Sequence, residues 1–211
     1  MTINCKGETL TLIKERAIYW AAERMLIISD LHIGKAAHFR KAGIQVPSTV
    51  SRTDLDKLSL LIEQYAPDTL LVTGDMFHHQ MNSEVESFRE WRIAFPQLRI
   101  MLIKGNHDLL ENEDYAALSI EVHAKEVLHG PFRFVHDQPK IFDEYYNITG
   151  HIHPGITIYG KARQQIKLPC FYFGRTCAIL PAFSVFTGLS KIRSEEGDQF
   201  YAITPEKVVA V

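Results

Sequence analysis

Residues that can bind divalent metals recur in five short clusters along this chain. Imidazole and carboxylate are ligands that divalent transition metals use. Two such ions, roughly 3.5–4 Å apart, can stabilise both the attacking and the leaving oxygen of a phosphoryl displacement. The residue types therefore indicate a hydrolase with two metals. The clusters are Asp30-Leu31-His32, Gly74-Asp75, Gly105-Asn106-His107-Asp108, His136 and Gly150-His151-Ile152-His153.

The spacing inside two clusters supports this interpretation. Asp30 and His32 are two residues apart, and so are His151 and His153. At the end of a strand such residues point to the same side, so Asp30 and His32 can reach one ion. His151 and His153 can do the same, or can serve one ion each. Taken alone, an Asp after a strand is most often a turn or helix-cap residue, and an isolated His is most often a surface residue. The joint occurrence of the clusters favours the metal interpretation.

Short apolar runs rich in β-branched residues end just before the clusters. Such runs are typical of buried strands, and open α/β sheets place their sites just beyond the strand ends. The predicted strands cover residues 25–29, 69–73, 100–103, 132–135 and 147–149, with later strands at 171–173, 177–180 and 200–203.

Helical patterns separate the early strands. Residues 51–65 and 83–95 carry apolar side chains at spacings of three and four, and residues 112–119 predict a shorter helix. Ser83-x-x-Glu86 fits a capping box for the second helix. The order βαβαβα, followed mainly by strands, predicts an α/β fold. Because no repeat or linker interrupts the pattern, we expect a single domain over residues 1–211.

Composition restricts the class of partner. The chain has 211 residues and a formal net charge of -2. That charge argues against binding of long nucleic acid through many basic side chains, although a nucleotide or a nucleic-acid end could still be bound. The 3 cysteines are scattered and odd in number, so we expect no disulfide framework and a cytoplasmic location. We also expect no signal peptide and no membrane association.

The ordered clusters resemble the calcineurin-like metallophosphoesterase superfamily, whose pattern is DxH, GD, GNH[D/E], H and GHxH. The resemblance implies a four-layer α/β/β/α sandwich of two mixed sheets flanked by helices. It also implies two metals that share one carboxylate. One metal would be held by Asp30, His32, Asp75 and His153, and Asp75 would bridge to a second that Asn106, His136 and His151 complete.

His136 is a single histidine, and the residues around it form almost no recognisable motif. His123 and His129 are the nearest alternatives, and we prefer His136 because it directly follows the apolar run at 132–135.

The resemblance also implies a catalytic role for His107. The equivalent histidine in the superfamily faces the phosphate and protonates, or hydrogen-bonds, the leaving oxygen. Asp108 would orient that imidazole and stabilise its charge. The structural alternative is that Asp108 only caps the following helix.

Residues 30–47 narrow the family. The pattern DLHxGK…FRxxGxxxP ends at Pro47 and looks like the bacterial branch called DNA ligase-associated metallophosphoesterases. Residues 74–78 and 180–188 are also similar to that branch, whereas Leu189 departs from an expected second glycine. The resemblance implies two divalent ions, with manganese favoured and iron, zinc or cobalt as alternatives.

The expected substrates are nucleotide-type phosphodiesters, such as 2′,3′-cyclic phosphates or nucleic-acid ends. The resemblance to this branch also implies a role in DNA or RNA repair, in functional association with an ATP-dependent DNA ligase and a helicase.

Four further residues could contact the substrate. Lys35, His38 and Arg40 could bind its phosphate, or could lie on an ordinary solvated loop. His78 lies three residues after Asp75 and could contact a metal ligand or the substrate, whereas we expect His79 to be exposed.

Alternative functions are a DNA-end nuclease or a phosphomonoesterase of the same superfamily. A non-catalytic scaffold of the same fold is disfavoured because all the predicted ligands and His107 are present.

Overall fold

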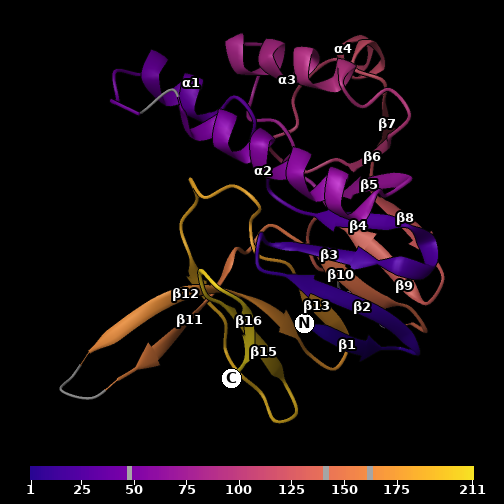
Figure 1. Cartoon of the computed structure of the whole chain (residues 1–211), viewed down its shortest axis with the longest axis vertical. Coiled ribbons are helices and arrows are strands. Elements are labelled where there is room, and N and C mark those ends of the chain that lie inside the picture. The colour runs from indigo at the N-terminus through magenta and orange to yellow at the C-terminus, as the bar shows by residue number, and fades with distance from the viewer. Residues whose placement is uncertain (47–48, 140–142, 161–163) are drawn as a thin grey trace.

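A computed structural model describes residues 1–46, 49–139, 143–160 and 164–211, and Pro47 lies outside these ranges. The chain folds into two facing sheets with helices along one side (Figure 1). The first sheet has the order β1-β2-β3-β4-β5-β6-β7, with β4 to β7 parallel and the others antiparallel. Its strands are β1 Thr2–Cys5, β2 Glu8–Ile13, β3 Ala17–Trp20, β4 Met25–Ile28, β5 Thr69–Val72, β6 Arg99–Ile103 and β7 Ile120–His123.

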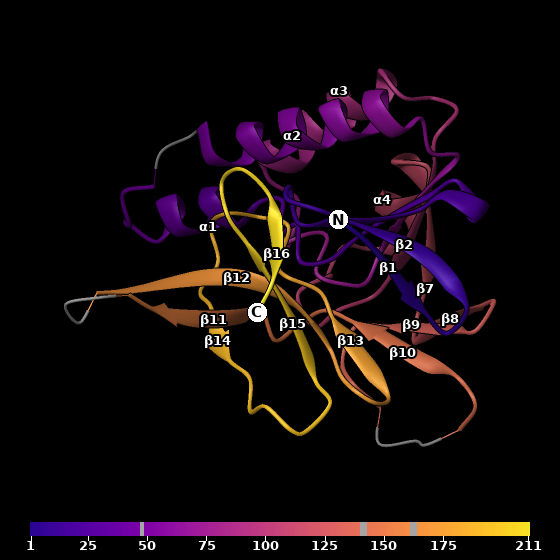
Figure 2. The same ribbon diagram turned by 60° about the horizontal axis from the view of Figure 1, so that its bottom comes forward.

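The second sheet is built from the rest of the chain. Its order is β14-β11-β12-β13-β10-β9-β8, and β15 pairs with β12 and with β16. Within it β9, β10 and β13 run parallel. A long β11–β12 hairpin projects from this sheet (Figures 1 and 2). The strands are β8 Glu126–His129, β9 Phe132–Val135, β10 Tyr146–Thr149, β11 Pro154–Tyr159, β12 Gln165–Phe173, β13 Cys177–Ile179, β14 Ser190–Lys191, β15 Gln199–Ile203 and β16 Val208–Ala210.

All helices within the described ranges lie before Leu118. They are the 3-10 helix η1 Ala21–Glu23 and the α-helices α1 Lys35–Lys41, α2 Thr49–Tyr65, α3 Ser83–Ile93 and α4 Asn112–Ala117. The α-helices gather on the side of the first sheet that faces away from the second (Figure 1). None of the described helices is long and apolar enough to cross a membrane.

The first sheet is buried on both faces, which explains the continuous apolar runs in its sequence. In β4, Leu26 and Ile28 pack into the core under the helices, whereas Ile27 packs into the core shared with the second sheet. Leu70 and Leu71 of β5 divide in the same way. The alternation follows the two-residue period of a strand. Each central strand is thereby fixed between two apolar cores, and its carboxyl end is held in place.

The α/β class and the two mixed sheets flanked by helices are confirmed, and so are the predicted strands and helices to within a few residues, except that β12 begins at Gln165 and not at 171. The capping box at Ser83 and Glu86 is wrong, because the N-cap of α3 is Asn82. The Asn82 side chain accepts hydrogen bonds from the backbone N–H groups of Glu84 and Val85. Asparagine is among the preferred N-cap residues, so the helix begins one residue earlier than the capping-box pattern placed it.

Candidate metal centre

The seven predicted ligands meet where parallel strands of both sheets end. Asp30 and His32 follow β4, and Asp75 follows β5. Asn106, His136 and the pair His151 and His153 follow β6, β9 and β10 in the same way. Hydrogen bonds from Asp30 N to Gly74 O (3.0 Å) and from His32 N to Asp75 O (2.9 Å) tie the first two loops together. The site is thus assembled from short loops on strands that the two cores hold rigid.

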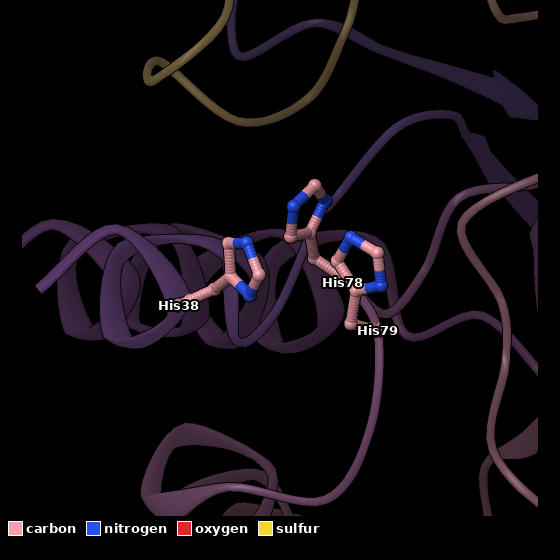
Figure 3. A group of neighbouring side chains, drawn as sticks. All are labelled: His38, His78 and His79. Carbon is pink, nitrogen blue, oxygen red and sulfur yellow. The ribbon is translucent and has the colours of Figure 1, made fainter. Parts of the chain in front are cut away.

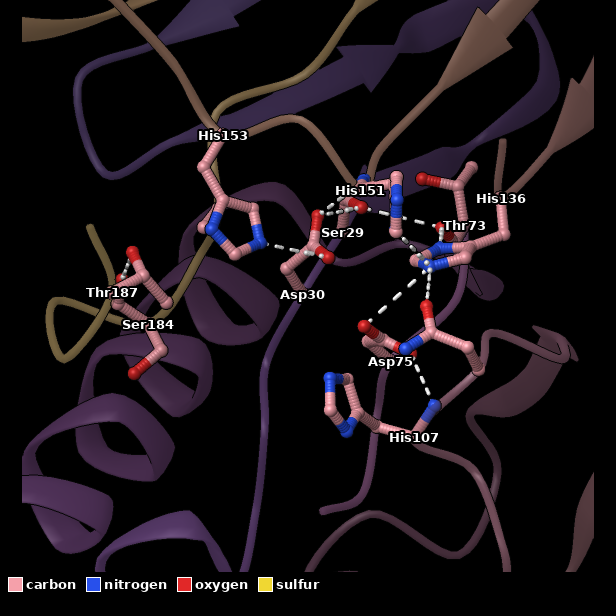
Figure 4. A network of polar contacts seen from close by, with 12 residues as sticks. Ser29, Asp30, Thr73, Asp75, His107, His136, His151, His153, Ser184 and Thr187 are labelled. Atoms are coloured by element: carbon pink, nitrogen blue, oxygen red, sulfur yellow. Dashed lines mark hydrogen bonds and ion pairs between the residues drawn. The ribbon is translucent and has the colours of Figure 1, made fainter. Parts of the chain in front are cut away.

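One group of ligands consists of Asp30, His32 and His153. Each offers a ligand atom, and these atoms lie within 4.8 Å of one another. Asp30 Oδ1 is 3.1 Å from His153 Nε2 (Figure 4). Among the described residues, both ring nitrogens of His32 are buried without a hydrogen-bond partner, and Asp30 Oδ1 and His153 Nε2 are close as an ion pair but form no hydrogen bond. Buried polar atoms normally have partners, so these four atoms fit a bound cation.

A second group consists of Asp75, His136 and His151, again with ligand atoms within 4.8 Å of one another. His136 Nε2 lies 3.1 Å from His151 Nδ1, 3.2 Å from Asn106 Oδ1 and 3.5 Å from Asp75 Oδ2 (Figure 4). His136 Nδ1 lies 2.9 Å from the carbonyl oxygen of Thr73 and must carry the proton. His136 Nε2 then has one of two states. It either directs a lone pair toward the oxygens of Asn106 and Asp75, which are also acceptors, or it is protonated. A metal at this point would satisfy all four atoms.

The pKa values of this second group also fit a bound metal. Burial lowers the pKa of His136, but the hydrogen bond and charge of Asp75 outweigh it and raise the pKa to about 9. Burial raises the pKa of Asp75, but His136 and the backbone N–H of His107 outweigh it and lower the pKa to about 2. The charge of Asp75 also acts on His32 of the first group. Asp75 therefore lies where one carboxylate can serve both groups.

Buried His32 has the electrostatic state of a metal ligand. It is 5% exposed, and its pKa is lowered to about 3, mainly by burial. A neutral imidazole is the form that coordinates a metal.

The backbone at the ligands is unusual. Five of the seven ligands have a positive φ, a conformation that non-glycine residues rarely adopt. Such strain persists where the surrounding structure enforces it, and it is common at functional sites. The five are Asp30 (φ 53), His32 (φ 51), Asp75 (φ 52), His151 (φ 65) and His153 (φ 54).

Two glycines allow the loops to approach the ligands closely. A Cβ atom at Gly105 would lie 2.2 Å from Asp75 Oδ1, and one at Gly74 would lie 2.0 Å from His136 Nδ1. Gly74 also has a φ of +91. Both positions therefore require glycine for steric reasons, which gives the GD and GNHD patterns a physical basis.

His107 and Asp108 lie in the loop after β6. His107 is half-buried, its backbone N–H donates to Asp75 Oδ1 at 2.9 Å, and burial lowers its pKa despite the charge of Asp75. Its ring stacks on His78, with centroids 4.6 Å apart. Asp108 accepts the backbone N–H groups of Phe77 and Gly105, each at 2.8 Å. Within the described ranges no hydrogen bond joins Asp108 to the His107 ring, so Asp108 positions the two loops rather than the imidazole directly.

The four predicted substrate contacts lie in three different surroundings. Lys35 lies near the centre, because the charges of Asp30 and Asp75 act on it. His38 and His78 lie beside His79. Arg40 instead pairs with buried Glu84 at 2.8 Å and so attaches α1 to α3. The guanidinium of Arg40 is thus paired with a carboxylate of the fold, and its contact with a substrate phosphate stays a prediction.

The predicted alternatives to His136 lie elsewhere. His123 pairs with Glu121 at 2.9 Å, and His129 pairs with Glu23 at 2.7 Å. Neither belongs to a ligand group among the described residues.

The loop at 180–188 contacts the centre through residues that the sequence did not reveal. Phe183 N donates to Ser29 O at 2.7 Å, and Ser184 N donates to Asp30 O at 3.3 Å. Two cations hold the other side of this loop. Arg16 Nη1 donates to Ala182 O (3.1 Å) and Ser184 O (2.8 Å), and Lys57 Nζ donates to Phe183 O (2.6 Å). These pairings join residues more than a hundred positions apart, so no local signal marks them.

Replacing Lys57 by Met should destabilise the fold. Lys57 Nζ is 3.2 Å from Asp54, which is 4% exposed at its side chain, so the substitution leaves a buried carboxylate without its cation. Removing one partner of a buried ion pair costs about 3–5 kcal/mol. Urea unfolding in a chelating buffer would measure the change without a contribution from metal. Exposed Lys41→Met is the control, and equal stability of the two variants would contradict the assignment.

A family match and a similar solved structure agree with this geometry. A family model described as calcineurin-like phosphoesterase matches residues 23–200. The crystal structure of Pseudomonas putida nuclease MPE is similar over 100% of this chain and 99% of that chain, with a TM-score of 0.84 and 28% sequence identity. The phosphoesterase Yfce from E. coli is similar over 89% of this chain and 97% of that chain, with a TM-score of 0.47 and 14% identity. No match was found among curated proteins.

Proposed function

Because this chain belongs to the calcineurin-like phosphoesterase family, we propose that it hydrolyses nucleotide-type phosphodiesters at a two-metal centre. The family and the nuclease of similar structure make it a metal-dependent hydrolase of phosphoric esters. The observation that supports the proposal best is the pair of three-residue ligand groups, with Asp75 acting on both. We assign Asp30, His32, Asp75 and His153 to one metal. Asp75, Asn106, His136 and His151 are assigned to the other.

The two ions would supply positive charge to the phosphoryl oxygens and lower the pKa of a bound water. The chain itself supplies position and charge. Burial keeps water from competing for Asp30 and His32, which are 0% and 5% exposed. His107 stands half-exposed beside Asp75, and we assign it the proton or hydrogen bond at the leaving oxygen. Lys35 adds a cation near the same carboxylates and can attract the substrate phosphate.

Nuclease activity is a second candidate, and one specific observation favours it. A solved structure that is similar over 100% of this chain is that of a nuclease. The net charge of -2 argues against tight binding of long duplex, so we favour nucleic-acid ends or unpaired strands over intact duplex.

The further details rest on the resemblance to the ligase-associated branch. We propose manganese as the metal, with iron, zinc or cobalt as alternatives that suit the same ligands. We also propose a repair role beside an ATP-dependent ligase and a helicase. A cytoplasmic location fits the free, buried state of Cys5, Cys170 and Cys177.

The substrate class can be tested with one panel. We expect Mn²⁺-dependent hydrolysis of bis(4-nitrophenyl) phosphate and of 2′,3′-cyclic AMP, and slower hydrolysis of 4-nitrophenyl phosphate. End-labelled single strands and duplexes belong in the same panel, over a salt series. Cleavage of oligonucleotides alone would identify a nuclease. Turnover of the monoester alone would overturn the phosphodiesterase proposal.

A further inference from the structure

Three histidines outside the two-metal centre form a cluster of their own. His38 lies on α1, and His78 and His79 lie on the loop after β5. Figure 3 shows their rings side by side, with His38 near the other two although 40 residues separate it from His78 in the sequence. A ligand nitrogen from each ring lies within 4.8 Å of the others. The fold thus brings three imidazoles together in addition to the predicted ligands.

The ring geometry is compact. The ring centroids of His38 and His79 are 4.6 Å apart, those of His78 and His79 are 4.7 Å apart, and those of His38 and His78 are 5.3 Å apart. Nitrogens around a tetrahedral zinc ion, bound at about 2.0–2.1 Å, are roughly 3.4 Å from one another. His38 is exposed and His79 is partly exposed, so small side-chain rotations can close the remaining distance.

A separate observation points to a ligand for this cluster. His78 is only 7% exposed, and its Nδ1 is buried without a hydrogen-bond partner among the described residues. An unpaired buried polar atom is unfavourable. A bound ion is one way to satisfy it, and it is the same signature that marks His32 at the two-metal centre.

The backbone at His79 has the same feature as the predicted ligands. Its φ is 66, and its N–H donates to the carbonyl of His107 at 3.1 Å. That hydrogen bond holds the strained turn and presents the two adjacent histidines together. Strain of this kind is a reason to suspect function.

We propose that His38, His78 and His79 form a third metal site. Its donors are three imidazoles with no carboxylate, so it should select Zn²⁺, Ni²⁺ or Cu²⁺ over Mn²⁺. Three protein ligands leave a fourth position for water or for an oxygen of a bound phosphate. The site stands independently of the proposed phosphodiesterase activity, because it shares no ligand with the two-metal centre.

Metal stoichiometry tests the proposal without a turnover assay. Wild-type protein saturated with Zn²⁺ and freed of excess by gel filtration should retain three ions per chain by mass spectrometry. His38→Ala/His79→Ala should retain two. His78 is left in place because it stacks on His107. His123→Ala/His129→Ala removes two histidines that pair with Glu121 and Glu23 instead, and this control should retain three.

A complementary variant separates this site from the two-metal centre. Asp75→Asn/His153→Ala weakens both of the other groups, and it should still bind one Zn²⁺ that the added His38→Ala/His79→Ala pair removes. Circular dichroism would confirm that each variant is folded. Equal Zn²⁺ content with and without His38 and His79, in both backgrounds, would overturn the third site. Wild-type protein that bound only the one Zn²⁺ removed by His38→Ala/His79→Ala would contradict the proposed function and leave the third site supported.

Discussion

Asp75→Asn is expected to reduce the Mn²⁺ content from two ions to at most one and to lower turnover by at least about 10³-fold. The substitution keeps the size of the side chain but removes its charge. That charge acts on His136 in one ligand group and on His32 in the other. The charge of Asp30 also acts on both His32 and His136, but Asp75 in addition pairs directly with His136 at 3.5 Å. Mass spectrometry of the purified protein and the rate of Mn²⁺-dependent diester hydrolysis measure the two effects.

Asp137→Asn is the matched control. Asp137 is an exposed carboxylate next to His136, and the contact shown for it is from the backbone N–H of Gln138. This variant should keep both ions and near-normal turnover. Added Mn²⁺ should also raise the melting temperature of wild type and of the control more than that of Asp75→Asn, since a ligand stabilises the state that binds it. Two retained ions and unchanged turnover in Asp75→Asn would remove its bridging role.

The sequence predicted the strand ends well because their signal is local. An apolar run followed by a polar cluster reports both the buried strand and its carboxyl end. Leu26 and Ile27 illustrate this, because each packs into a different core and the run must be apolar throughout. The positions of Asp30 and Asp75 then follow from parallel pairing of β4 with β5.

The sequence did not predict which partner each polar side chain would choose. Arg40 could serve either a phosphate or a carboxylate, and the packing of α1 on α3 selects Glu84. Asp108 has two backbone N–H groups within reach, and these occupy its oxygens. Arg16 lies on the β2–β3 turn, far along the chain from Ser184, whose carbonyl it binds. Such pairings depend on long-range packing, which the pattern of residue types does not encode.

His107→Ala is expected to lower kcat by about 10²–10⁴-fold, the usual contribution of a general acid, while both metals are retained. The side chain of His107 belongs to neither ligand group. Its backbone N–H, which donates to Asp75, survives the substitution. The loss should therefore appear in turnover and be absent from metal content.

The leaving group provides the sharper test of the same role. A nitrophenolate leaves without a proton, whereas the alkoxide of a nucleotide diester needs one. If His107 donates that proton, His107→Ala should slow cyclic-nucleotide or oligonucleotide hydrolysis far more than aryl-diester hydrolysis. The control is His129→Ala, because His129 pairs with Glu23 and should leave both rates unchanged. An equal loss with both leaving groups would assign His107 to stabilising phosphoryl charge instead, and no loss with either would exclude it from the reaction.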